Sequence, residues 1–258
     1  HITETAFENG WVKPPTPREE RPESIGIIGA GPAGLAAADM LRRRGYQVEI
    51  YDRYDRVGGL LIYGIPGFKL EKDIVERREK LLRDGGVTFH LNVDIGGDTS
   101  FAELREKHDA VLIATGVYKA RELNIDGAER DGVIPALDFL TASNRLGMGD
   151  DLSSDETDRY FAEGRRVVVI GGGDTAMDCV RTAIRQKAAS VSCLYRRDRA
   201  NMPGSAREVM NAEEEGVNFE WLTMPEGFEG GDAVEAVRCS KIHLGQPDAT
   251  GRRVPCLL

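Results

Sequence analysis

Short apolar runs and glycine-rich turns alternate along this chain, and the alternation occurs twice. From Ile25 an apolar strand leads to a glycine turn, a helix with apolar positions on one face, and a second strand through Val48 and Ile50. The apolar run 166–170 restarts the same cycle. A strand, turn, helix and strand in this order is typical of a βαβ unit with parallel strands. The sequence therefore predicts an α/β protein with two Rossmann-like dinucleotide-binding domains.

Segments between these units predict the domain boundaries. Prolines among charges in 11–24 disfavour both helix and sheet, and the acid-rich run 147–164 predicts a mobile surface loop. The apolar run 109–116 predicts a buried strand. The predicted organisation is a linker over 1–24, a first Rossmann-like domain over 25–146, the acidic loop over 147–164, and a second Rossmann-like domain over 165–258.

Composition and charge narrow the function. With 258 residues and a formal net charge of -9, the chain lacks the positive charge that attracts nucleic acid or an anionic membrane. No long apolar run or signal-peptide pattern is present, so we expect a cytoplasmic location. The four cysteines are scattered without a C-x-x-C spacing, which disfavours a metal site, an iron-sulfur site or a redox dithiol. Small molecules and proteins remain as partners.

The first glycine turn reads Gly29-Ala30-Gly31-Pro32-Ala33-Gly34, the fingerprint of a dinucleotide site. Its glycines allow a tight turn, close approach of a pyrophosphate and close packing of helix on strand, while the helix N-terminus favours phosphate. Asp52 follows the next strand and is placed to accept hydrogen bonds from ribose hydroxyls. A carboxylate about 4 Å from a 2'-phosphate is repelled by about 4 kcal/mol at a dielectric near 20. The first site therefore favours FAD or NAD.

The second glycine turn has the opposite charge at the equivalent place. It reads Gly171-Gly172-Gly173-Asp174-Thr175-Ala176, with Gly171, Gly173 and Ala176 at the fingerprint positions, and the next strand ends in Arg196 and Arg197. Planar guanidinium groups match the geometry of a 2'-phosphate, so this site favours NADPH. A solvated basic strand end is the alternative for the arginine pair, and helix capping is the alternative for Asp174 and Thr175.

Further strings connect the two units to a known family. Gly58 and Gly59 would let the backbone pass close to a cofactor, with a plain turn as the alternative. Tyr63 is equally suited to a place beside a flavin or to the core. The chain resembles the small (beta) subunit of bacterial NADPH-dependent glutamate synthase, and more broadly the two-dinucleotide flavoprotein reductases. The resemblance rests on 9–14 (NGWVKP), 51–60 (YDRYDRVGGL), 63–70 (YGIPGFKL), 114–118 (ATGVY), 171–178 (GGGDTAMD), 195–199 (YRRDR) and 201–205 (NMPGS).

This resemblance implies FAD at the first turn and NADPH at the second, with hydride transfer from nicotinamide to flavin. It adds Arg53, Leu60, Ala114, Thr115 and Gly116 to the expected cofactor-binding residues. It also implies that electrons pass through 4Fe-4S clusters to the large (alpha) subunit, which makes glutamate from glutamine and 2-oxoglutarate. Cofactors carry this chemistry, so no side chain is nominated as catalytic.

Two departures from the family lead to an expectation about this chain. The family's cysteine-rich N-terminal domain would precede residue 1, and the strand that closes its FAD site would follow Leu258. We therefore expect a chain truncated at both ends that binds no cluster, holds FAD weakly or not at all, and lacks full turnover.

Three alternatives remain open on sequence. The chain could belong to a dihydropyrimidine dehydrogenase, or to a ferredoxin-NADP reductase of the adrenodoxin type, since the first fingerprint does not separate them. It could also be a nucleotide-binding adapter without turnover. A disulfide reductase is disfavoured because the segment 60–70 contains no cysteine.

Overall fold

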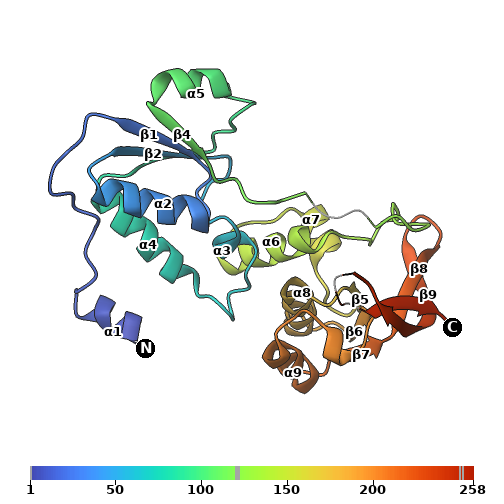
Figure 1. Cartoon of the computed structure of the whole chain (residues 1–258). Coiled ribbons are helices and arrows are strands. Elements are labelled where there is room, and N and C mark those ends of the chain that lie inside the picture. The colour runs from blue at the N-terminus through green and yellow to red at the C-terminus, as the bar shows by residue number, and fades with distance from the viewer. Residues whose placement is uncertain (1, 120–122, 250, 252) are drawn as a thin grey trace. The chain divides into compact units, whose positions relative to one another are not determined.

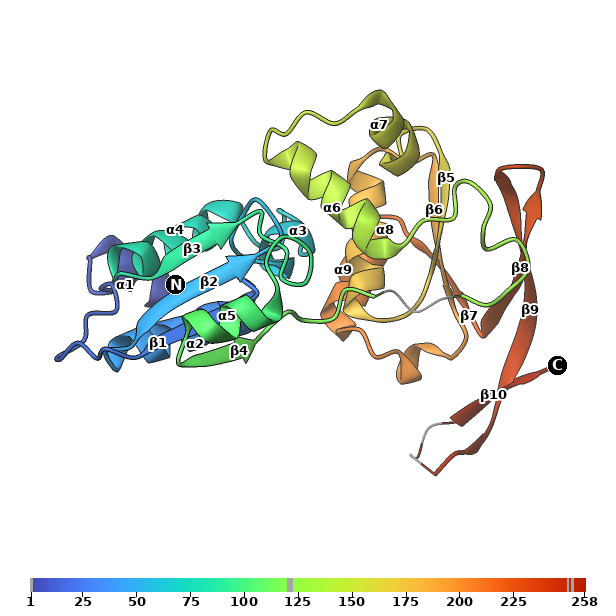
Figure 2. The same cartoon turned by 90° about the horizontal axis from the view of Figure 1, so that it is seen from above.

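The computed structural model describes residues 2–119, 123–249, 251 and 253–258. Two compact units divide the chain, residues 1–118 (unit 1) and 119–258 (unit 2), and each is described by itself (Figures 1 and 2). Within the described ranges, every helix is too short or too polar to reach across a lipid bilayer.

Unit 1 is built on a parallel sheet of four strands in the order β3-β2-β1-β4. In Figure 1, helices α2 and α4 lie on one side of this sheet and α5 on the other. Two further helices, α1 and α3, precede β1 and α4 respectively. The bounds are α1 Ile2–Glu8, β1 Ser24–Ile28, α2 Pro32–Arg43, β2 Gln47–Asp52, α3 Leu60–Tyr63, α4 Lys72–Asp84, β3 Thr88–Leu91, α5 Phe101–Lys107 and β4 Ala110–Ile113.

The core of unit 1 follows from the two periodicities of the sequence. Alternate residues of β2, Val48 and Ile50, face the same side as Leu35 and Ala38 on α2, because strand side chains repeat every two residues and helix side chains every three to four. Leu82 closes this cluster from α4 and is fully buried. Burial of these apolar groups fixes α2 on the sheet, and with it the glycine turn at the start of α2.

Polar side chains cover the other face of the same sheet. The Tyr51 hydroxyl donates to Glu49 Oε2 (2.8 Å) and lies 3.0 Å from His108 Nε2. Burial raises the pKa of Glu49, but hydrogen bonds from Lys107, Tyr51 and His90 outweigh it and lower the pKa to about 2. His90 and His108 thus belong to a polar network with Glu49 and Tyr51 on this face of the sheet.

Unit 2 contains a parallel sheet in the order β5-β6-β7 and an antiparallel sheet in the order β10-β9-β8. Its core joins Met177 and Val180 on α8 to Val191 and Cys193 on β6. The bounds are α6 Ala136–Gly147, α7 Ser154–Tyr160, β5 Arg166–Ile170, α8 Asp174–Arg185, β6 Ser190–Tyr195, the 3-10 helix η1 Arg199–Asn201, α9 Ala206–Glu214, β7 Asn218–Trp221, β8 Thr223–Gly230, β9 Val234–Pro247 and β10 Arg253–Leu257.

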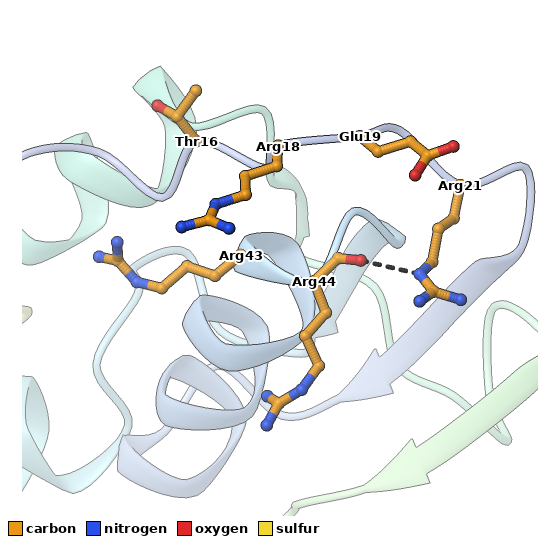
Figure 3. A pocket seen from close by; sticks show the side chains of 6 residues that line it. All are labelled: Thr16, Arg18, Glu19, Arg21, Arg43 and Arg44. Atoms are coloured by element: carbon orange, nitrogen blue, oxygen red, sulfur yellow. Dashed lines mark hydrogen bonds between the residues drawn. The ribbon is translucent and has the colours of Figure 1, made fainter.

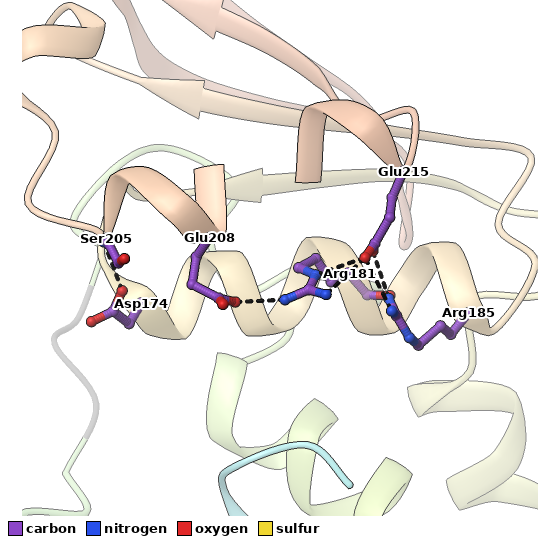
Figure 4. Close-up of polar contacts among 6 residues, drawn as sticks. All are labelled: Asp174, Arg181, Arg185, Ser205, Glu208 and Glu215. Carbon is purple, nitrogen blue, oxygen red and sulfur yellow. Dashed lines mark hydrogen bonds and ion pairs between the residues drawn. The ribbon is translucent and has the colours of Figure 1, made fainter. Parts of the chain in front are cut away.

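An ion-pair network joins α8 to the end of α9 (Figure 4). Glu215 accepts hydrogen bonds from Arg181 and Arg185, while Arg181 also donates to Glu208 at 2.6 Å. Burial raises the pKa of Glu215, but the two guanidinium groups outweigh it and lower the pKa to about 2. Because Arg181 is nearly buried, its two carboxylate partners keep it from being an unpaired buried charge.

Acid is expected to weaken unit 2 through Glu215. The pKa of Glu215 is lowered from 4.5 to about 2 in the folded chain. Its contribution to the free energy of unfolding is therefore complete above pH 4.5 and is lost as the pH falls toward 2. We expect acidification over this range to lower the free energy of unfolding by about 1 to 2 kcal/mol, because solvent screens the exposed part of the network. Chemical unfolding at several pH values measures this. Glu215→Gln should remove this part of the pH dependence, and the exposed control Glu214→Gln should keep it; equal profiles in both variants would contradict the assignment.

Three boundaries differ from the sequence prediction. The predicted linker 1–24 contains α1, which Arg77 of α4 holds through Glu4. The predicted acidic loop 147–164 contains α7, because Ser153 and Glu156 form a capping box that satisfies the first backbone N–H groups of that helix. Residues 119–146 group with unit 2 rather than with the first domain, since α6 packs on α8.

The strand predicted to be buried is instead an edge strand. β4 pairs only with β1 among the described strands, and its Leu112 and Ile113 are 39% and 63% exposed. An apolar run indicates a strand but does not show whether neighbours cover it. The prediction was therefore right on the element and wrong on its burial.

Candidate dinucleotide sites

The first glycine turn joins β1 to α2 through tight backbone contacts. Gly29 has a φ of +110° and donates its N–H to the Tyr51 carbonyl at 2.7 Å. A Cβ added to Gly34 would lie 1.9 Å from the Gly29 oxygen, so helix and turn approach more closely than alanine permits. A Cβ added to Gly31, the N-cap of α2, would meet no atom within 4 Å. Open space therefore lies at Gly31, where a pyrophosphate would approach the helix N-terminus.

Asp52 lies against this turn at the end of β2. Its Oδ2 accepts the Ala30 N–H at 2.6 Å, and its Oδ1 accepts the Tyr54 N–H at 2.9 Å. The carboxylate thus holds the turn in addition to the ribose role expected from the sequence. A carboxylate offers about four acceptor positions, so positions remain for ribose hydroxyls.

Asp52→Asn is expected to loosen the glycine turn. An amide presents one acceptor oxygen and an NH₂ group, so one of the two backbone N–H groups would face a donor. We expect a loss of about 1 to 3 kcal/mol in local stability. Amide hydrogen exchange at Ala30 and Tyr54 measures it, with the exposed Asp73→Asn as control. Unchanged protection at both amides would show that the carboxylate does not hold the turn.

Other predicted residues of the first site meet at the same edge of the sheet. The Gly58 N–H donates to the Ala30 carbonyl at 2.9 Å, and a Cβ added to Gly59 would lie 3.0 Å from the Gly31 Cα. A Cβ added to Gly29 would lie 2.5 Å from the Ala114 carbonyl oxygen. The structure therefore brings together residues from three separated segments. Pro32, Ala33, Leu60, Thr115 and Gly116 belong to these same segments and are exposed.

Aromatic side chains beside this edge were only partly anticipated. The Arg53 guanidinium lies 5.0 Å from the ring centres of both Tyr54 and Tyr118, so the arginine stacks on these rings. The Tyr63 hydroxyl donates to Asp55. Burial, and to a smaller extent this hydrogen bond, raises the pKa of Tyr63. Sequence reasoning named Arg53 and Tyr63 but missed Tyr118 as a neighbour of Arg53, because a ring contact over such a separation leaves no local pattern.

Lys72 supports the same region and was also missed. Its ammonium donates to the carbonyls of Leu61 (3.0 Å) and Ile65, near the end of α3. Burial lowers the pKa of Lys72 to about 8. The lysine therefore ties α4 to the chain on either side of Tyr63.

The second glycine turn joins β5 to α8 in the same way. The Gly171 N–H donates to the Leu194 carbonyl at 3.1 Å, which places the turn beside the end of β6. A Cβ added to Gly173, the N-cap of α8, would meet no atom within 4 Å. Ala176 is buried against the turn, where the first unit has Gly34. The second turn therefore offers the same open helix N-terminus.

A loop after β6 is fastened to this turn, and sequence reasoning missed it. A Cβ added to Gly172 would lie 2.5 Å from the Tyr195 ring, so Gly172 is required for contact with that ring. The Gly204 N–H donates to the Gly172 carbonyl at 2.9 Å. The Ser205 N–H donates to Asp174 Oδ1, also at 2.9 Å (Figure 4). Asp174 thus binds the loop instead of capping α8, whose N-cap makes no side-chain hydrogen bond. Thr175 is exposed in the first turn of α8.

The arginines after β6 have different environments. Arg196 is exposed and makes no hydrogen bond or ion pair with any residue in the described ranges. Arg197 donates from Nε to the Arg253 carbonyl at 3.2 Å. Arg199 forms two hydrogen bonds of 2.8 Å with Glu213 and is thereby occupied. Arg196 is therefore the guanidinium most available to a ligand at this turn.

The thiols of the chain offer no redox pair. All four cysteines are free, and burial raises the pKa of both Cys179 and Cys193 to about 12. Across the described ranges, no three His, Cys, Asp or Glu side chains gather closely enough to hold a metal ion. What the described residues present is two glycine turns, each with an open helix N-terminus.

Comparison with known families agrees with this geometry. Residues 23–248 match the model of the family described as pyridine nucleotide-disulphide oxidoreductase. The chain belongs to this family. Membership confirms the predicted α/β fold with two Rossmann-like domains, and the matched range includes both glycine turns.

Individual proteins within the family show which members this chain is similar to. The chain is 61% identical, over 99% of its length, to the glutamate synthase [NADPH] small chain of Azospirillum brasilense and covers 53% of that protein. It is 46% identical, over 98% of its length, to the glutamate synthase [NADPH] small chain of Escherichia coli (strain K12) and covers 54% of it. The resemblance to this group is thereby confirmed, and the chain spans about half the length of these relatives.

A solved structure shares the fold. Mycobacterium tuberculosis FprA in complex with NADPH superposes with a TM-score of 0.76 at 22% sequence identity, covering 91% of this chain and 67% of that one. At this identity the likeness shows the fold alone.

Proposed function

We propose that this chain is the dinucleotide-binding part of an NADPH-oxidising flavoprotein, with FAD at the first glycine turn and NADPH at the second. The observation that carries the proposal is the reversal of charge at equivalent positions. Asp52 ends β2 beside the turn of unit 1, whereas the exposed Arg196 follows β6 beside the turn of unit 2. The names of the relatives, which specify NADPH, support the same assignment.

The first site fits FAD through its backbone and one carboxylate. The open space at Gly31 admits a pyrophosphate at the N-terminus of α2, where the helix dipole favours negative charge. The remaining acceptor positions of Asp52 would take the adenosine ribose hydroxyls. Gly58 and Gly59 pack closely across from this turn, because a Cβ at Gly58 would lie 2.6 Å from Val75 Cγ1 and a Cβ at Gly59 would lie 3.0 Å from the Gly31 Cα.

The second site fits NADPH through the open N-cap at Gly173 and the guanidinium of Arg196. A 2'-phosphate would receive charge-assisted hydrogen bonds from Arg196. Arg197 would join it by giving up its bond to the Arg253 carbonyl. Tyr195 and the loop fastened to Asp174 would form the wall behind the pyrophosphate.

Bound FAD would supply the chemistry by accepting a hydride from the nicotinamide. The chain's own residues bind and orient the two cofactors, so catalysis depends on their positions and no side chain has to move a proton. Electron transfer through iron-sulfur centres to a glutamate synthase large subunit, for glutamate formation from glutamine and 2-oxoglutarate, belongs to the same proposal. So does the cytoplasmic location expected from the sequence.

Anaerobic reduction of the flavin tests this function. In the longest natural chain that contains this sequence, NADPH is expected to remove the visible absorbance of the bound flavin, and NADH is expected to do so far more slowly. Co-purification with a large subunit would support the glutamate synthase role. Binding of NADPH without flavin reduction would instead indicate an adapter and overturn the proposal.

A further inference from the structure

A tyrosine that follows β4 reaches the first glycine turn of unit 1. Between β4 and this tyrosine stands Gly116, whose φ of +70° lies in the left-handed region and lets the chain change direction. A Cβ added to Gly59 would lie 3.3 Å from the Tyr118 hydroxyl oxygen and 3.0 Å from the Gly31 Cα. The hydroxyl and the glycine turn are therefore both within contact distance of one point beside Gly59.

The ring of Tyr118 is held by two neighbours. The Arg53 guanidinium lies 5.0 Å from the centre of this ring, and the Tyr54 ring lies 5.7 Å from it at an interplanar angle of 40°. Arg53 Nη2 also donates to the Tyr54 hydroxyl at 3.2 Å. A cation is attracted to an aromatic face, and tilted rings at this separation pack favourably. These contacts give the Tyr118 hydroxyl a defined direction.

The Tyr118 hydroxyl is a donor that the described residues do not use. It makes no hydrogen bond within the described ranges, although the residue is half-buried. The buried tyrosines Tyr51 and Tyr195 each donate to a protein oxygen, as tyrosines removed from water usually do. Burial, followed by the charges of Tyr54 and Asp52, raises the pKa of Tyr118, so the hydroxyl keeps its proton at neutral pH.

The space beside this hydroxyl favours an anion. Gly31 is the N-cap of α2, and no side chain there binds the first backbone N–H groups of the helix. These N–H groups and the positive end of the helix dipole attract negative charge. A Cβ added to Gly31 would meet no atom within 4 Å, so a ligand can approach them. Arg53, which lies against the Tyr118 ring, adds a positive charge from another segment.

We propose that the Tyr118 hydroxyl donates a hydrogen bond to the pyrophosphate of the dinucleotide at the first glycine turn, with Arg53 as the positioning residue for its ring. A hydrogen bond to a charged oxygen is shorter and stronger than one between neutral groups. The inference rests on the proposed function and deepens it, because it adds a binding residue from the segment after β4 that lies outside the glycine fingerprint.

Calorimetric titration of FAD into the flavin-free form of the longest natural chain that contains this sequence tests the contact. Tyr118→Phe removes the hydroxyl and keeps the ring, so we expect FAD to bind about tenfold more weakly than to the wild type. Tyr160→Phe is the matched control, since Tyr160 is also half-buried and its hydroxyl makes no hydrogen bond within the described ranges. We expect the control to bind FAD within about twofold of the wild type.

Phosphorus NMR of the bound FAD identifies the group that the hydroxyl contacts. The pyrophosphate resonances are expected to shift in Tyr118→Phe and to stay unchanged in the control. Unchanged affinity in Tyr118→Phe, or weaker binding without a phosphorus shift, would overturn the inference and leave the proposed FAD site intact. Failure of the wild type itself to bind FAD would overturn the proposed function and this inference together.

Discussion

Replacing Arg196 and Arg197 together with alanine is expected to reduce the preference for NADPH over NADH by about 100-fold, because each charge-assisted hydrogen bond contributes about 1.5 to 3 kcal/mol. NADH lacks the 2'-phosphate, so its affinity should change little. Arg196 should account for more of the loss than Arg197, since Arg197 is bound to the Arg253 carbonyl before any ligand arrives. Titration of both nucleotides into the wild type and the variants measures the ratio.

A matched control separates this effect from a general loss of charge. Arg207 is exposed on α9 and makes no hydrogen bond or ion pair within the described ranges, so Arg207→Ala should leave the nucleotide preference unchanged. The two single variants, Arg196→Ala and Arg197→Ala, divide the contribution between the pair. If the double variant keeps the wild-type preference, neither arginine binds the 2'-phosphate and NADPH recognition must lie elsewhere.

Replacing two glycines of the first turn with alanine is expected to have different effects, one on stability and the other on FAD binding. In Gly34→Ala the new Cβ would lie 1.9 Å from the Gly29 oxygen, which is backbone and has little freedom to move. We expect unit 1 to lose about 3 kcal/mol of stability, at the upper end of overpacking costs, because helix and turn must separate. Thermal or chemical unfolding of the chain measures this loss.

Gly31→Ala should instead spare the fold and impair binding. Its Cβ would meet no protein atom within 4 Å, yet it would point into the space where a pyrophosphate approaches. We expect unchanged stability and at least about tenfold weaker FAD binding, measured in the longest natural chain that contains this sequence. Gly67→Ala, also without a neighbour within 4 Å, is the control for both properties. Unaltered FAD affinity in Gly31→Ala would remove the pyrophosphate from this turn.

Much of the fold could be predicted from local patterns. The spacing of apolar residues indicated both βαβ units, which the structure has as β1-α2-β2 and β5-α8-β6. Local patterns predicted the segments between the two βαβ units less well. Composition suggested a loop over 147–164, whereas the pair Ser153 and Glu156 caps a helix there. A capping box such as Ser153 and Glu156 marks the start of a helix even inside an acid-rich, polar segment, and composition alone does not show it.

The sequence by itself determined the two glycine turns, the charge that follows each, and the family, because these depend on residues adjacent in the chain or in one βαβ repeat. Only the tertiary structure decided that Asp52 holds the turn, that Tyr195 requires Gly172, and that β4 is exposed. It also decided that Arg18, from the segment before β1, lies near Arg43 and Arg44 at the end of α2 (Figure 3). These contacts join segments distant in sequence, and packing of helices on sheets brings them together without leaving any local periodicity.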